Sequence, residues 1–158
     1  MEHNKSSQLF ALVSQIDTAL DPYFTKKAPQ LPDNIRELLV KLAPYFTILG
    51  VILAALGLLV LIGVSAFASP FLLMFAGVGG AQAIAGGVLG IIFMAIQAGL
   101  EAMAIPGLFK NQRSAWELLY IAALVGVIYN LVSMNLFSLV VNFLISFYIL
   151  YQIKSYYK

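Results

Sequence analysis

The chain has 158 residues, of which 61% are hydrophobic and only 10% are charged, and its mean hydropathy is +0.92. Soluble domains carry about 25% charged residues, so this composition excludes an ordinary soluble fold. The formal net charge is only +2, with no basic patch interleaved with aromatic residues, which argues against a nucleic-acid partner. The sequence has no cysteine, which excludes disulfides, thiolate metal sites and cysteine nucleophiles.

A more polar N-terminal region, residues 1–41, precedes the apolar part of the chain. Residues 6–20 are expected to form a short amphipathic helix, because apolar side chains recur at spacings of three and four. These side chains are Leu9, Val13, Ile16 and Leu20. The helix would lie on the membrane surface, dock on a partner or pack against the protein's own cytoplasmic face. After a linker with three prolines, a second short amphipathic helix is expected to begin at Asp33.

The rest of the sequence predicts an all-α, polytopic membrane protein with four transmembrane helices arranged as two hairpins. Residues 42–100 and 118–153 carry no charged side chain, and each stretch far exceeds the ~18 apolar residues that indicate a membrane span. The predicted spans, within a transmembrane domain of residues 42–158, are residues 43–68, 82–105, 115–133 and 136–153. Residues 69–81 are expected to form an apolar connection along the outer membrane surface.

Three local patterns predict where these spans begin and end. Ser69-Pro70 is expected to break the first span, and Pro106-Gly107 to end the second. Ser114 and Glu117 have the spacing of a capping box, in which the two side chains satisfy backbone N–H groups at the start of the third span.

The basic residues predict the orientation of the chain. All nine lie in residues 1–41, in the loop 105–117 or in the last five residues, and four spans bring these three regions to one side. Lysine and arginine are enriched in cytoplasmic loops. We therefore expect a multi-pass protein of the cytoplasmic membrane with both termini in the cytoplasm.

The candidate polar pathway consists of Gln97, Glu101, Asn130 and Asn142. A carboxylate at membrane depth costs several kcal/mol unless it is paired, hydrated or protonated, which makes Glu101 a candidate for binding protons or cations. The structural alternative is that Glu101 forms an ion pair with Lys110 or Arg113 in the adjoining loop. Interhelical hydrogen bonds would likewise account for the two asparagines without a ligand.

A second candidate feature is a face of small residues in the second span. It comprises Gly79, Ala83, Gly86, Gly87 and Gly90. Small residues allow helices in lipid to approach closely, so this face predicts packing against the first span or against a second copy of the chain.

Four segments resemble a family of small, uncharacterised bacterial membrane proteins with four spans. They are residues 31–37 (LPDNIRE), 104–109 (AIPGLF), 115–120 (AWELLY) and 151–157 (YQIKSYY). The resemblance implies a bacterial cytoplasmic membrane as the setting. It brings no activity, cofactor or site residue with it.

The sequence contains no nucleotide-binding, zinc-binding or serine-nucleophile motif. We therefore expect a non-enzymatic integral membrane protein without a cofactor, acting through helix packing and contacts with partners. The expected partners are the lipid bilayer and either a second copy or another membrane protein. The alternative is a small oligomeric channel or transporter that handles protons or ions.

Overall fold

The computed structural model describes the backbone of residues 2–158, and the side chains of residues 11–25 and 27–158. Within this range every regular element is helical. In chain order the elements are α1 (Glu2–Asp21), a π-helical turn η1 (Pro22–Lys27), α2 (Asp33–Phe109), α3 (Arg113–Val132), α4 (Leu136–Ile153) and a 3₁₀ turn η2 (Lys154–Tyr156). The all-α prediction is confirmed, and α3 and α4 agree with the predicted spans to within two residues.

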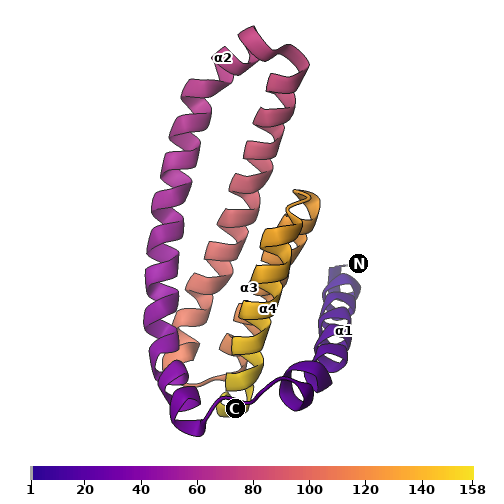
Figure 1. Cartoon of the computed structure of the whole chain (residues 1–158), viewed down its shortest axis with the longest axis vertical. Helices are drawn as coiled ribbons and strands as arrows, with labels where there is room; N and C mark the ends of the chain where they lie inside the picture. The colour runs from indigo at the N-terminus through magenta and orange to yellow at the C-terminus, as the bar shows by residue number, and fades with distance from the viewer. Residues whose placement is uncertain (1) are drawn as a thin grey trace.

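Helix α2 is a long hairpin rather than one straight rod (Figure 1). Its path reverses near Gly77, which has φ 51° and ψ −123°, a conformation that a residue without a Cβ adopts most readily. The backbone is also crowded at Gly80, where an added Cβ would lie 2.0 Å from the carbonyl oxygen of Leu72. We call residues 33–76 the first arm, residues 78–109 the second arm, and Gly77 with its neighbours the bend.

Two predicted helix ends are wrong. The helix continues through Ser69 and Pro70, and the Ser69 hydroxyl donates to the carbonyl oxygen of Ser65 one turn earlier. It also continues through Pro106 and Gly107 and ends at Phe109. A proline removes only one backbone hydrogen bond, and helices in an apolar environment tolerate that loss because an open loop would expose many more polar groups.

The start of α2 and the start of α3 also differ from the predictions. The helix that begins at Asp33 is not a separate short element, because it continues without interruption into the first arm. The capping box does not form: α3 begins at Arg113, with no side-chain cap, and Glu117 instead accepts a hydrogen bond from Arg113 at 3.4 Å. The division into two domains at residue 41 stays a prediction.

The two hairpins differ greatly in length. At 1.5 Å per residue the first arm is about 66 Å long and the second about 48 Å, whereas α3 and α4 are about 30 Å and 27 Å. Figure 1 shows α3 and α4 beside the lower half of the second arm, ending well before the bend. Three helices, α2, α3 and α4, are long and apolar enough to cross a membrane. In length and composition, therefore, these helices confirm the expectation of membrane-spanning segments.

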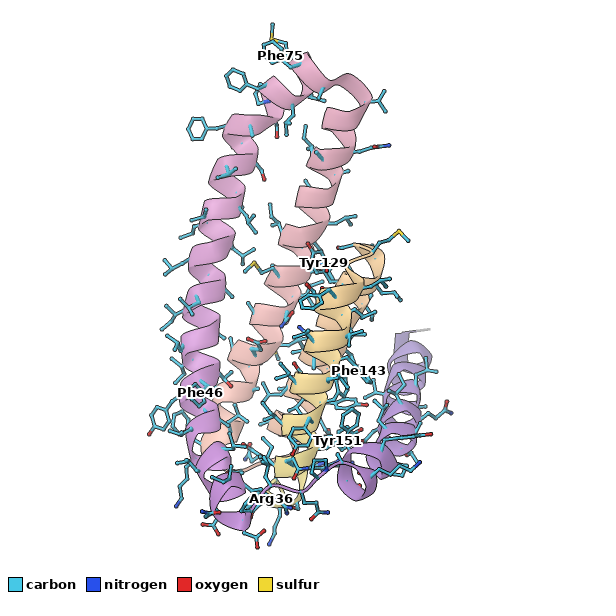
Figure 2. The ribbon with its side chains drawn as sticks, in the orientation of Figure 1. Arg36, Phe46, Phe75, Tyr129, Phe143 and Tyr151 are labelled. Atoms are coloured by element: carbon cyan, nitrogen blue, oxygen red, sulfur yellow. The ribbon has the colours of Figure 1, made fainter. Side chains whose placement is uncertain are left out.

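The core lies at the lower end of the molecule, where the start of α3 and the end of α4 meet η1. We define the aromatic core as Phe24, Trp116, Tyr120, Phe147 and Tyr151, all nearly inaccessible to solvent. The Phe24 ring stacks on Tyr151 with centroids 5.5 Å apart, and the Trp116 indole Nε1 donates to the carbonyl oxygen of Leu150 at 2.8 Å. Figure 2 shows Tyr151 at this end, whereas Phe75 lies at the bend with open surroundings.

Helix α1 packs against this core through only part of the apolar face that the sequence predicts for it. Val13 and Leu20 pack against the buried cluster, but Ile16 is 40% exposed. Asp17 takes the inward place instead, since its carboxylate accepts hydrogen bonds from the hydroxyl of Tyr151 and from Lys154, both at 2.8 Å. The fourth residue of the predicted face, Leu9, lies outside the range of side chains that the structure describes.

Candidate functional site

The candidate site is built around Glu101, which lies in the second arm and faces the first. Eight residues separate it from the end of α2, so it is about 12 Å inside the helix. It is partly buried, and its Oε1 accepts a hydrogen bond from Gln97 Nε2 at 3.1 Å. On the opposite arm Gly50 leaves space for it, since a Cβ there would lie 3.8 Å from Glu101 Oε2. A cavity of about 310 Å³ adjoins both side chains between the two arms.

The ion pair expected for Glu101 is not formed. Arg113 lies instead within 3.4 Å of Glu117 and 4.0 Å of Asp17, and Lys110 is exposed. Among the described side chains no basic group pairs with Glu101. The reason is geometric: α2 continues to Phe109, which moves the basic turn away from Glu101 compared with a helix ending at Pro106.

Gly126 of α3 is the point where polar side chains from three helices converge. A Cβ at this position would lie 3.3 Å from Gln97 Oε1 of the second arm and 3.7 Å from Asn142 Nδ2 of α4. The absence of a side chain on α3 therefore allows both amides to approach its backbone. Asn130 Nδ2 donates to the Gly126 carbonyl oxygen at 2.8 Å. We call Gln97, Glu101, Gly126, Asn130 and Asn142 the polar junction.

The structure thus brings all four residues of the predicted polar pathway to one place. Asn135, at the start of α4, does not belong to the junction, because its side chain caps the helix by accepting a hydrogen bond from the backbone N–H of Ser138 at 3.2 Å. Deeper in the helix, Ser146 Oγ donates to Asn142 Oδ1 at 3.4 Å and extends the junction by one turn. Gly126 was not singled out from the sequence, where an isolated glycine inside an apolar helix is the only signal.

The predicted face of small residues points in several directions. Gly87 faces the first arm, where a Cβ would lie 3.8 Å from Ser65 Oγ, and Gly90 faces α3, where a Cβ would lie 3.0 Å from the Tyr129 hydroxyl. A Cβ at Gly79 or Gly86 would meet nothing within 4 Å, and Ala83 is exposed. Packing within the chain therefore involves two of these five residues.

Among the described residues, no group of three or more histidine, aspartate or glutamate side chains gathers in one place. The chemistry that the polar junction offers is one carboxyl group, three amides and a hydroxyl in an apolar surrounding. Searches against protein families, curated proteins and solved structures found no match to the chain. The resemblance to small bacterial membrane proteins therefore remains an expectation.

Proposed function

We propose that the chain is a four-span protein of the bacterial cytoplasmic membrane, with the two arms of α2, then α3 and α4, as its spans. Both termini would lie in the cytoplasm. Arg36, Arg113 and Lys154 come from three separate basic regions and line a single cavity at one end of the molecule. This common location supports the orientation, because cytoplasmic ends of membrane helices are enriched in lysine and arginine.

Within this topology, the function that the geometry favours is the binding and transfer of protons or small cations at the polar junction. The observation that carries this proposal is the surrounding of Glu101: a carboxyl group about 12 Å inside an apolar helix, beside a cavity, with an amide as its hydrogen-bond partner. A carboxyl group at membrane depth is a functional candidate by default, and Glu101 forms no ion pair with a basic side chain among the described residues.

A second candidate is the non-enzymatic accessory role, in which the protein acts through contacts with another membrane protein. The observation in its favour is the first arm, whose most apolar stretch has no residue buried within the molecule. That arm is also longer than the ~30 Å hydrocarbon core of a bilayer. Lipid would cover only the part of the first arm that lies within the hydrocarbon core. The apolar length beyond that core is what favours a protein partner.

The two candidates differ in the flux expected from the purified protein in liposomes. We expect an imposed pH or cation gradient to dissipate faster with the wild-type chain than in empty liposomes. Glu101→Gln should lower that rate at least about tenfold, which corresponds to about 1.4 kcal/mol on the barrier. Glu117→Gln is the matched control, because Glu117 lies at the start of α3 and is half exposed, and its rate should stay within about twofold of wild type.

Two outcomes would overturn the leading proposal. Equal flux for wild type and Glu101→Gln would remove the role given to Glu101. No flux above empty liposomes for any ion tested would leave the accessory role as the better candidate.

A further inference from the structure

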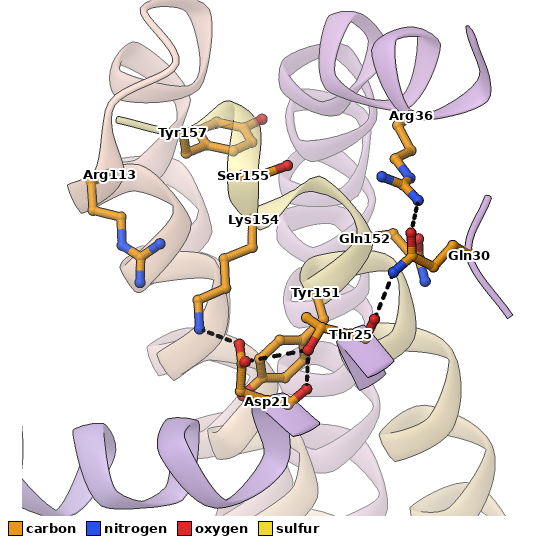
Figure 3. Close-up of a pocket in the computed structure, with 10 residues that line it drawn as sticks. All are labelled: Asp21, Thr25, Gln30, Arg36, Arg113, Tyr151, Gln152, Lys154, Ser155 and Tyr157. Atoms are coloured by element: carbon orange, nitrogen blue, oxygen red, sulfur yellow. Dashed lines mark hydrogen bonds and ion pairs between the residues drawn. The ribbon is translucent and has the colours of Figure 1, made fainter. Parts of the chain in front are cut away.

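A second cavity lies at the basic end of the molecule, about 440 Å³ in volume and separate from the polar junction. This volume is within the range of about 300–1,000 Å³ typical of ligand sites. Its charged lining consists of three basic side chains and one acidic side chain, namely Arg36, Arg113, Lys154 and Asp21. Figure 3 shows that these groups come from different segments, with Arg36 and Gln30 on one side and Lys154 and Arg113 on the other.

Of the three basic side chains, Arg36 has the weakest neutralisation of its charge by nearby carboxylates. Its side chain is only 17% exposed, and its nearest carboxylate, on Asp33, is 3.6 Å away and 85% exposed. Its Nη2 donates to Gln30 Oε1 at 2.9 Å, but its Nε is buried and has no acceptor. Burying a cation is costly unless it is paired and its donors are satisfied. Arg36 therefore has one solvent-exposed anionic partner, Asp33, and one buried donor, Nε, that is left without an acceptor.

A second unsatisfied group lines the same cavity. The Tyr157 side chain is 3% exposed, and its hydroxyl has no hydrogen-bond partner among the described residues. Burial raises the pKa of this phenol, so the hydroxyl keeps its proton and remains a donor at neutral pH.

The walls of the cavity are held in place by other contacts. Gln30 Nε2 donates to the carbonyl oxygen of Thr25 at 2.7 Å, which fixes the amide that orients Arg36. The buried Gln152 side chain accepts from the backbone N–H of Leu31 at 3.1 Å and donates to the carbonyl oxygen of Pro29 at 3.3 Å. The linker between η1 and α2 is thus pinned to the end of α4, and the donors are preorganised rather than placed on a loose loop.

Lys154 is already neutralised in part, because its ammonium group lies 2.9 Å from Asp21 and 2.8 Å from Asp17. Arg113 has only the longer pairs described above and is 38% exposed. The net excess of positive charge is therefore on the Arg36 and Arg113 sides of the cavity. Guanidinium groups bind acceptors with several oxygens, such as carboxylate and phosphate, through two parallel hydrogen bonds.

We infer that this cavity binds a phosphate group, either the headgroup of an anionic membrane lipid or a soluble phosphate compound, with Arg36 as its main ligand and the Tyr157 hydroxyl as a further donor. The inference does not depend on the function proposed for Glu101. It rests on the proposed topology in one respect: there the cavity lies at the cytoplasmic ends of the spans, where the headgroups of the inner leaflet would be.

The test uses the full-length protein purified in a neutral detergent, with bound molecules detected by native mass spectrometry. The probes are phosphatidylglycerol, diacylglycerol as the same lipid without phosphate, and inorganic phosphate. Arg36→Gln should weaken phosphate-dependent binding about tenfold or more, as expected for loss of a hydrogen bond to a charged group. Lys41→Gln is the matched control, because Lys41 is exposed on the same arm one turn and a half further along.

Tyr157→Phe and Arg36→Lys keep the test informative if Arg36→Gln folds poorly. The first removes only the hydroxyl and the second keeps the charge but loses the planar fork, and each should weaken binding severalfold. Binding of phosphatidylglycerol but not diacylglycerol would support a lipid headgroup, and binding of inorganic phosphate alone would support a soluble ligand. Binding of neither phosphate probe, or equal loss in the Arg36 and Lys41 variants, would overturn the inference.

Discussion

Gly107 allows the close approach of α2 and α3, and substituting it with alanine provides a sensitive test of how these helices pack. An added Cβ would lie 2.7 Å from the Cβ of Ala115 and 3.2 Å from Gln112 Oε1. Carbon atoms at optimal separation are about 3.5–4.0 Å apart, so the helices would have to separate by about 1 Å. Neither methyl group can rotate away. We therefore expect a cost of about 2–3 kcal/mol, at the upper part of the usual range for overpacking.

The same substitution has a favourable component, which a control on the same helix isolates. Replacing glycine with alanine inside a helix gains about 0.8–1 kcal/mol in propensity. Gly99 is exposed, and a Cβ there meets nothing within 4 Å. Gly99→Ala should therefore leave stability unchanged or raise it by up to about 1 kcal/mol. The net loss expected for Gly107→Ala is about 1–2 kcal/mol.

These energies correspond to measurable shifts in thermal unfolding. For a chain of this size about 2–4 °C accompanies each kcal/mol, so Gly107→Ala should lower the midpoint by about 2–8 °C. Trp116 is the only tryptophan, is 1% exposed and follows Ala115 directly, so its fluorescence reports on this contact in the detergent-solubilised protein. A midpoint for Gly107→Ala equal to or above that of Gly99→Ala would refute the close packing of Gly107 against Ala115.

Two further substitutions test the core and the bend. Trp116→Phe should lower the free energy of unfolding by about 1–3 kcal/mol, because it leaves the buried carbonyl oxygen of Leu150 without its donor. Thermal unfolding followed by far-UV circular dichroism measures this loss. An unchanged midpoint would contradict the stabilising role of the indole hydrogen bond. Gly77→Ala should cost about 1–3 kcal/mol in backbone strain in the same assay, whereas Gly79→Ala, which has neither strain nor a close neighbour, should have little effect. Equal midpoints for these two glycine variants would contradict the bend at Gly77.

The sequence predicted the helical segments well because the signals for them are strong. Uncharged stretches far longer than a bilayer span leave only helices as the expected structure, and α4 begins at Leu136, where the sequence predicts the start of the fourth span. The ends of α2 were harder to predict. Pro70 and Pro106 predict helix ends, but in an apolar segment the surrounding hydrogen bonds keep the helix intact.

The bend and the polar junction were predicted in part, since both depend on contacts distant in sequence. Nothing local distinguishes Gly77 from Gly79, although only the first has a positive φ. Glu101, Gln97 and Asn142 were recognisable because polar groups are rare in such helices. Their convergence on Gly126 depends on the relative rotation and depth of three helices, which hydrophobic periodicity leaves open when every face is apolar.

The docking of α1 onto the end of α4 has a consequence for the time course of biosynthesis. Asp17 and its partner Lys154 are 137 residues apart. At translation rates of about 5–20 residues per second, roughly 7–27 s pass between the synthesis of these two side chains. During that interval α1 has no α4 to bind, and the hairpin of α2, which ends at Phe109, is synthesised before α4 begins. Helix α1 is thus made before α4 and can dock only after α4 has been synthesised, so the ribosome, rather than the intrinsic speed of folding, sets the earliest moment at which the aromatic core can close.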